Sequence, residues 1–120
     1  MNAVSSFSTP RYGNGILRTA RDAEYDVFSR VTRMLRHAAG GSHTDLIQAV
    51  HKNNELWTIL ASDLASDGNS LPDQLRAGLL SLAGFALRHG HRALANGAEL
   101  APLIDINLAV MRGLRQEAAT

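Results

Sequence analysis

Apolar residues recur along this chain at the three- and four-residue spacing of helices, and no segment shows the strict alternation typical of a strand. The pattern predicts four helices. The first spans about residues 20–37, and the second starts near Thr44 and ends before Asp67. The third starts at Pro72 and breaks before Glu99, and the fourth follows Pro102 and runs to about residue 113 or 114.

Local signals support these boundaries. Gly40 and Gly41 would stop the first helix, and Ser42 stands three residues before Asp45, the spacing of a capping box. Ser70 and Asp73 repeat that spacing before the third helix, where Pro72 suits a first turn.

The middle of the third helix, residues 77–87, is uncharged and apolar on every side. It is shorter than the roughly 20 residues that cross a bilayer, so we expect a helix inside a bundle rather than a membrane span. The connections are short, which favours an antiparallel arrangement. The sequence therefore predicts an all-α protein, a small antiparallel bundle of about four helices. We expect a flexible N-terminal arm (1–17), a single helical domain (18–115) and a frayed tail (116–120).

Composition narrows the function. The 120-residue chain has no cysteine, which fits a reducing cytoplasm and excludes thiolate metal sites and cysteine nucleophiles. No secretion signal is visible in residues 1–10. Twelve basic and eleven acidic residues leave a net charge of +1, which does not supply the concentrated basic face of a nucleic-acid binder. Arginines do gather in and before the first helix, interleaved with acids, and we interpret that face as solvated. They are Arg18, Arg21, Arg30, Arg33 and Arg36.

No catalytic pattern is present. The sequence lacks a Gly-rich phosphate loop, a nucleophile elbow and a convincing carboxylate pair. His89 and His91 point to nearly opposite sides of a helix, and His37 and His43 lack a third ligand, so we interpret the histidines as exposed or at helix ends. We expect no enzyme, cofactor or metal.

Three features suggest binding to another protein, each with a structural alternative. Asn53 and Asn107 lie on apolar stripes, and either fix helix register or contact a bound helix. Leu56 and Ile59 lie off the core stripe of the second helix, among charges, and either dock a partner or pack on a further neighbour. Trp57, the only tryptophan, is either core or a binding hot spot.

Three stretches together resemble the FlaF family, regulators of flagellin production in flagellated alphaproteobacteria. They are Arg21-Asp22-Ala23-Glu24-Tyr25 with Phe28, Val31-Thr32 and Leu35; Asn53-Asn54-Glu55-Leu56-Trp57 with Leu71-Pro72 and Leu75-Arg76; and Leu103-Ile104-Asp105-Ile106-Asn107 with Met111 and Gly113-Leu114. The resemblance implies a cytoplasmic, non-enzymatic protein that binds flagellin as a secretion chaperone does and acts alongside the translational regulator FlbT.

On this interpretation an amphipathic terminal helix of flagellin would dock on the bundle. We expect the contact to involve residues of the second and fourth helices, namely Asn53, Leu56, Trp57, Ile59, Asp105, Asn107 and Met111. The alternatives are direct binding of flagellin messenger RNA, or an adaptor that meets FlbT or a second copy of itself.

Overall fold

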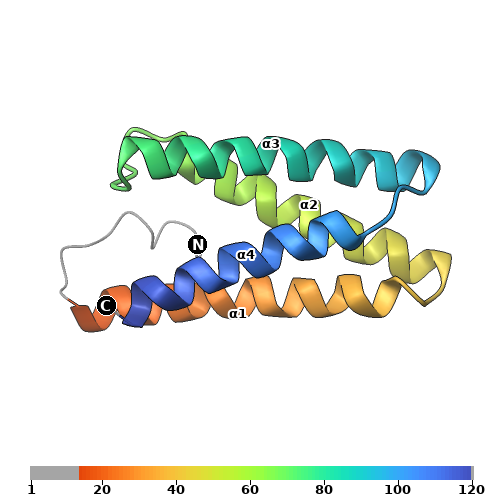
Figure 1. Ribbon diagram of the computed structural model, residues 1–120, viewed down its shortest axis with the longest axis horizontal. Helices are drawn as coiled ribbons and strands as arrows, with labels where there is room; N and C mark the ends of the chain where they lie inside the picture. The colour runs from red at the N-terminus through yellow and green to blue at the C-terminus, as the bar shows by residue number, and fades with distance from the viewer. Residues whose placement is uncertain (1–13, 120) are drawn as a thin grey trace.

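The computed structural model describes the backbone of residues 14–119 and the side chains of residues 24–114. Its four helices are α1 (Asn14–Ala38), α2 (His43–Leu64), α3 (Asp73–Asn96) and α4 (Ala101–Ala119), and the described residues contain no strand (Figure 1). The predicted all-α bundle of four helices is confirmed. Residues 1–13 of the predicted N-terminal arm lie outside the described residues.

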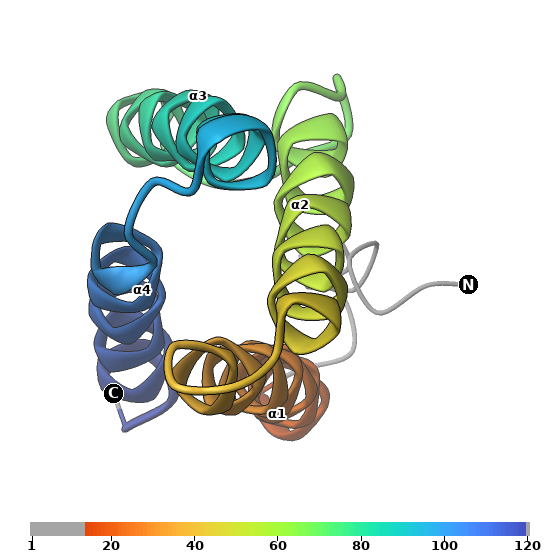
Figure 2. The same ribbon diagram turned by 90° about the vertical axis from the view of Figure 1, so that its right-hand side faces the viewer.

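The four helices enclose the core from four sides when the bundle is viewed from one end (Figure 2). α1 lies opposite α3, and α2 lies opposite α4. Three neighbouring pairs pack extensively, namely α1 with α4, α2 with α3, and α1 with α2. α3 and α4 touch far less, because they diverge from the connection that joins them (Figure 1). One side of the bundle is therefore less closed than the other three.

The predicted cap of the second helix is confirmed. Ser42 is the N-cap of α2, and its hydroxyl oxygen accepts a hydrogen bond from the backbone N–H of Asp45 at 3.1 Å. Gly97 ends α3 with a φ of 75°, a left-handed conformation that glycine adopts without a steric penalty. The predicted cap at Ser70 is wrong, because the N-cap of α3 is Pro72 and no side-chain hydrogen bond caps it.

Two helices extend beyond their predicted ends. α1 begins at Asn14 rather than near Ala20, and α4 continues to Ala119 rather than ending near Gly113. Gly113 does not end α4, since one glycine in a helix costs only about 1 kcal/mol relative to alanine and the residues after it favour helix. Glycine and polar residues are therefore weaker helix stops in α1 and α4 than the sequence pattern indicates.

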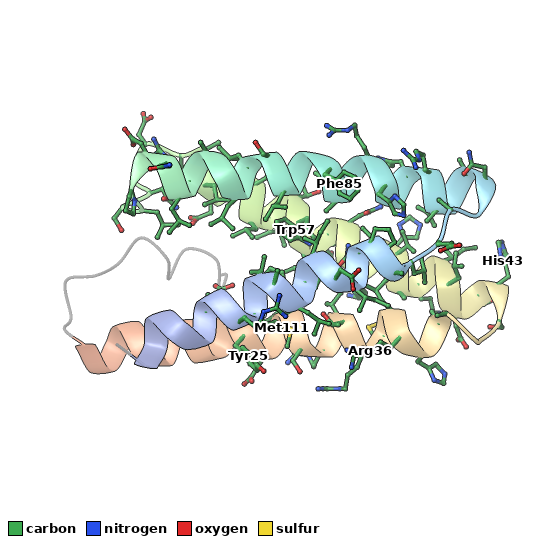
Figure 3. The ribbon with its side chains drawn as sticks, viewed as in Figure 1. Tyr25, Arg36, His43, Trp57, Phe85 and Met111 are labelled. Carbon is green, nitrogen blue, oxygen red and sulfur yellow. The ribbon has the colours of Figure 1, made fainter. Side chains whose placement is uncertain are left out.

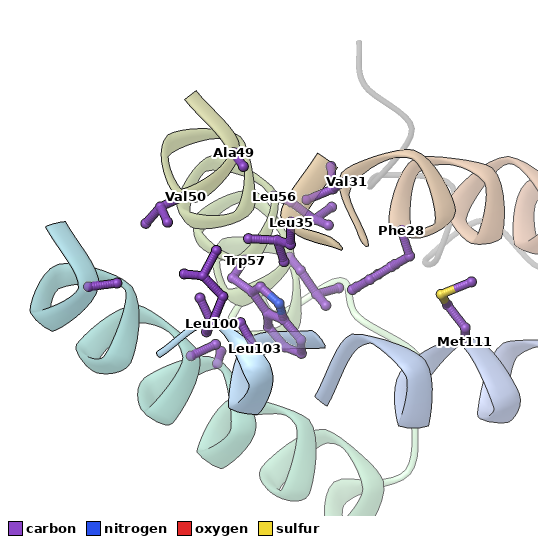
Figure 4. Packing of buried hydrophobic residues seen from close by; sticks show 14 of the residues in the cluster. Phe28, Val31, Leu35, Ala49, Val50, Leu56, Trp57, Leu100, Leu103 and Met111 are labelled. Carbon is purple, nitrogen blue, oxygen red and sulfur yellow. The ribbon is translucent and has the colours of Figure 1, made fainter. Parts of the chain in front are cut away.

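The core contains large apolar side chains from α1, α2 and α4, on the stripes that the sequence predicts (Figure 4). Phe28, Leu35, Trp57 and Leu103 are each 0% exposed. The rings of Phe28 and Trp57 meet edge to face, with centroids 5.6 Å apart and planes at 80°. This contact joins α1 to α2 near the middle of the bundle.

The prediction that the middle of α3 is buried on all sides is wrong. Ala83 and Ala86 are buried, but Phe85 remains 40% exposed, and Leu75, just before this segment, is 42% exposed. The reason is the divergence of α4, which leaves α3 with one extensive neighbour, α2. That contact is close at Gly90, where an added Cβ atom would overlap the side-chain amide of Asn54.

Candidate functional site

The two amides predicted on the core stripes lie together with the tryptophan between α2 and α4. The indole N–H of Trp57 donates to Asn107 Oδ1 at 2.9 Å, and Asn107 Nδ2 donates to Asn53 Oδ1 at 2.8 Å. All three side chains are 0% exposed. Hydrogen bonds in such surroundings are costly to break and fix how two helices face each other. This arrangement favours the register interpretation of Asn53 and Asn107.

Five of the seven predicted contact residues are therefore core residues in this structure. Besides Asn53, Trp57 and Asn107, Leu56 is 6% exposed and Met111 is 9% exposed. The sulfur of Met111 lies 3.9 Å from the hydroxyl of Thr32 on α1. Figure 3 shows Trp57 inside the bundle. These five side chains hold the helices together and do not face solvent.

Ile59 and Asp105, the other two predicted contact residues, are exposed but do not share a surface. Ile59 is two residues from Trp57, and Asp105 is two residues from Asn107, so each points about 160° away from its inward-facing neighbour. Because Trp57 and Asn107 point at each other, Ile59 and Asp105 point away from each other. One partner helix cannot contact both side chains.

Two of the four large apolar side chains that are exposed on the described surface, Leu75 and Phe85, belong to α3. Leu75, Leu82 and His89 follow at seven-residue intervals and share one side of α3. That side faces α4, because His89 Nε2 lies 2.5 Å from the carbonyl oxygen of Glu99, just before α4. Phe85, labelled in Figure 3, stacks on His89 with centroids 5.8 Å apart and stands at the edge of the same side.

α4 presents matching residues toward α3. Met111 contacts α1, and Ile106 and Val110 lie on the opposite flank of the same helix. Both side chains are partly buried. α3 and α4 separate with distance from the loop that joins them (Figure 1). Leu75, near the start of α3, therefore remains exposed although it lies on the interior side of the helix. We define the α3–α4 face as Leu75, Leu82, Phe85, Ile106 and Val110.

His89 departs from the expectation that the histidines are exposed or at helix ends. It is 6% exposed. Its contacts with Phe85 and with the Glu99 carbonyl join α3 to the loop before α4, at the end where these two helices are connected. No sequence signal distinguished this histidine from His91, which is exposed. No group of three or more histidines and acids suited to hold a metal ion occurs among the described residues.

Sequence analysis also missed a buried acid, Glu24, on the core side of α1. Its side chain is 1% exposed, and its Oε2 has no hydrogen-bond partner. Burial, reinforced by the negative charge of Asp63 on α2, raises the pKa of Glu24 to about 7. Burial also raises the pKa of Asp63, although a hydrogen bond from Asn69 Nδ2 at 3.1 Å opposes that shift. Burial therefore favours the protonated form of both carboxyl groups.

Comparison with known proteins identifies one family. The sequence model of the family described as flagellar protein FlaF matches residues 12–114. No curated protein and no solved structure matches the chain. Within the described residues, none of the helices has the length and apolar character needed to cross a membrane.

Proposed function

The chain belongs to the FlaF family of flagellar proteins, and we propose that it binds flagellin in the cytoplasm as a secretion chaperone does. In this role it supports flagellin synthesis, export and filament assembly by binding and not by catalysis. FlbT is a second partner that the family resemblance suggests. The observation that carries the proposal is the α3–α4 face, an apolar side of the bundle that the protein leaves partly uncovered.

The apolar α3–α4 face suits the apolar stripe of a flagellin helix. Flagellin subunits polymerise through amphipathic terminal helices, whose apolar stripes need cover before export. A helix of this kind lying between α3 and α4 would bury the exposed parts of Leu75 and Phe85, where the bundle has no helix of its own. Burial of apolar surface contributes roughly 25 cal/mol per Å² and drives helix-in-groove binding. The client would act as a fifth helix of the bundle.

Ile59 provides the alternative contact surface. It is 42% exposed, as is Leu75, but it lies on the outer side of α2. Its neighbours on that side include Lys52 and Glu55, which pair with each other at 3.4 Å. One isolated aliphatic side chain offers a client less apolar area than the α3–α4 face does, so we place the client on the latter.

Calorimetric titration with purified flagellin monomer tests both surfaces. Leu75→Asp and Phe85→Asp place a charge that the client must desolvate, and we expect each to weaken binding at least tenfold, about 1.4 kcal/mol. Ile59→Asp is the matched control, with the same substitution at similar exposure, and we expect little change. If only Ile59→Asp weakens binding, flagellin binds the outer side of α2 and not the α3–α4 face. If the unmodified protein yields no heat with flagellin, the proposed function is wrong.

A further inference from the structure

A second surface, between α1 and α2, combines positive charge with an apolar floor. It is a groove of about 480 Å³ near the loop that joins the two helices. Seven residues line it, namely Arg30, Val31, Arg33, Met34, His37, Asp45 and Gln48. In Figure 2, α1 and α2 meet on the side of the bundle diagonally opposite the α3–α4 face. The groove is therefore separate from the surface where we place flagellin.

The α1 side of the groove carries two arginines that form no ion pair with a described residue. Arg30 forms no ion pair with any described residue, and Arg33 donates only to the hydroxyl of Ser29, at 2.8 Å. The single acid in the lining, Asp45, lies in the first turn of α2, where the helix dipole already favours a negative charge. Asp45 also lies 3.8 Å from His37. The groove thus presents two guanidinium groups that have no carboxylate partner among the described residues.

The groove is apolar beside these arginines, toward α2. Met34 is 37% exposed, one of four large apolar side chains that stand out from the described surface, and Val31 beneath it is 7% exposed. Arg30, Met34 and His37 are spaced at four and three residues, so they form one ridge along α1. Methionine is adaptable in shape and is common at surfaces that bind helices. A ligand suited to this groove needs an apolar side chain flanked by carboxylates.

We propose that the α1–α2 groove binds an acidic amphipathic helix of a partner protein. An apolar side chain of that helix contacts Met34, and glutamate or aspartate side chains on its flank pair with Arg30 and Arg33. Guanidinium groups bind carboxylates through two parallel hydrogen bonds, which gives this contact its selectivity. The groove does not depend on the identity of the client at the α3–α4 face. With both surfaces occupied, the protein would hold a client and a second protein at once.

Two other occupants fit the groove less well. Single-stranded RNA is recognised by stacking bases on aromatic rings, and no Phe, Tyr or Trp side chain lines the groove. A second copy would meet the first across a twofold axis, and this would bring the arginines of two identical grooves together. Like charges placed so close disfavour association. Charge complementarity therefore favours an acidic protein segment.

The test uses two defined peptides and the full chain. The first is a fluorescein-labelled 18-residue amphipathic helix with a leucine stripe flanked by glutamates, and the second carries lysine at each glutamate position. Fluorescence anisotropy at about 0.15 M salt measures both affinities. We expect the glutamate peptide to bind and the double variant Arg30→Glu with Arg33→Glu to weaken it at least tenfold. The same variant should bind the lysine peptide better than the unmodified protein does.

A matched double variant controls for net charge. Arg88→Glu with Arg92→Glu changes the total charge equally, at two exposed arginines on α3, and we expect it to leave the glutamate peptide bound. Met34→Ser should weaken binding without changing the charge, and circular dichroism checks that every variant is folded. The proposal is overturned if the glutamate peptide does not bind, if both double variants weaken it equally, or if a 20-nucleotide single-stranded RNA binds the groove more tightly than the peptide.

Discussion

Replacing Asn107 by alanine tests the buried contact that joins α2 to α4. The substitution removes the hydrogen bonds to Trp57 Nε1 and to Asn53 Oδ1, at 2.9 and 2.8 Å. It leaves one buried donor and one buried acceptor without partners, and each costs about 1–3 kcal/mol. Water entering the space would recover part of that cost. We therefore expect a loss of about 2–4 kcal/mol, a large fraction of the roughly 5–15 kcal/mol that stabilises a typical domain.

Urea denaturation followed by circular dichroism measures this loss. Asp105→Ala is the control, since it lies on the same helix, is exposed and should change stability by no more than about 0.5 kcal/mol. Asn53→Ala combined with Asn107→Ala should cost less than the sum of the single changes, because the two amides share one bond. If Asn107→Ala costs no more than Asp105→Ala, the amides do not connect α2 and α4 as described.

Two further predictions concern α1 and α3. The pKa of Glu24 is raised from 4.5 to about 7, so the folded protein retains a proton that the unfolded chain loses, and the free energy of unfolding should fall as pH rises from about 4.5 to 7. The raised pKa of Asp63 acts in the same direction. Urea titrations at several pH values should show a shallower fall of the unfolding free energy with pH for Glu24→Gln than for the unmodified protein. An equal fall in both proteins would contradict the burial of this acid. Gly90→Ala should destabilise the protein by about 1–2 kcal/mol because its methyl group meets Asn54, whereas Gly78→Ala, with no atom within 4 Å of the new Cβ, should stabilise it by up to about 1 kcal/mol. Thermal unfolding compares the two, and equal shifts would rule out the close approach at Gly90.

Periodicity and turn chemistry predict most of this fold. The apolar stripes of α1, α2 and α4 identify the core, and Ser42 and Gly97 mark helix ends where local chemistry alone decides the conformation. The position of α3 could not be predicted in this way. Its apolar middle indicates burial on all sides, but the burial of a helix depends on how far its neighbours diverge. Divergence is a tertiary property that no local pattern encodes.

The candidate surfaces were harder to predict, because a residue's angle on its own helix does not show which neighbour covers it. Of the two aliphatic residues that lie off the core stripe of α2, for which the sequence leaves docking and packing both open, Ile59 is exposed. Leu56, about 60° away around the helix, packs in the core. The amides of Asn53 and Asn107 bond each other instead of facing solvent. The apolar segment 77–87 of α3 predicts burial on every side, so the exposure of Phe85, and of Leu75 just before the segment, does not follow from the sequence.

Hydrogen–deuterium exchange, measured by mass spectrometry with and without flagellin monomer, tests the central claim most directly. We predict slower exchange on both sides of the α3–α4 face, in residues 75–89 of α3 and 102–110 of α4, with the outer side of α2 unchanged. Exchange that slows only in α1 and α2, or nowhere at a flagellin concentration that saturates binding, would contradict the claim that a flagellin helix docks between α3 and α4.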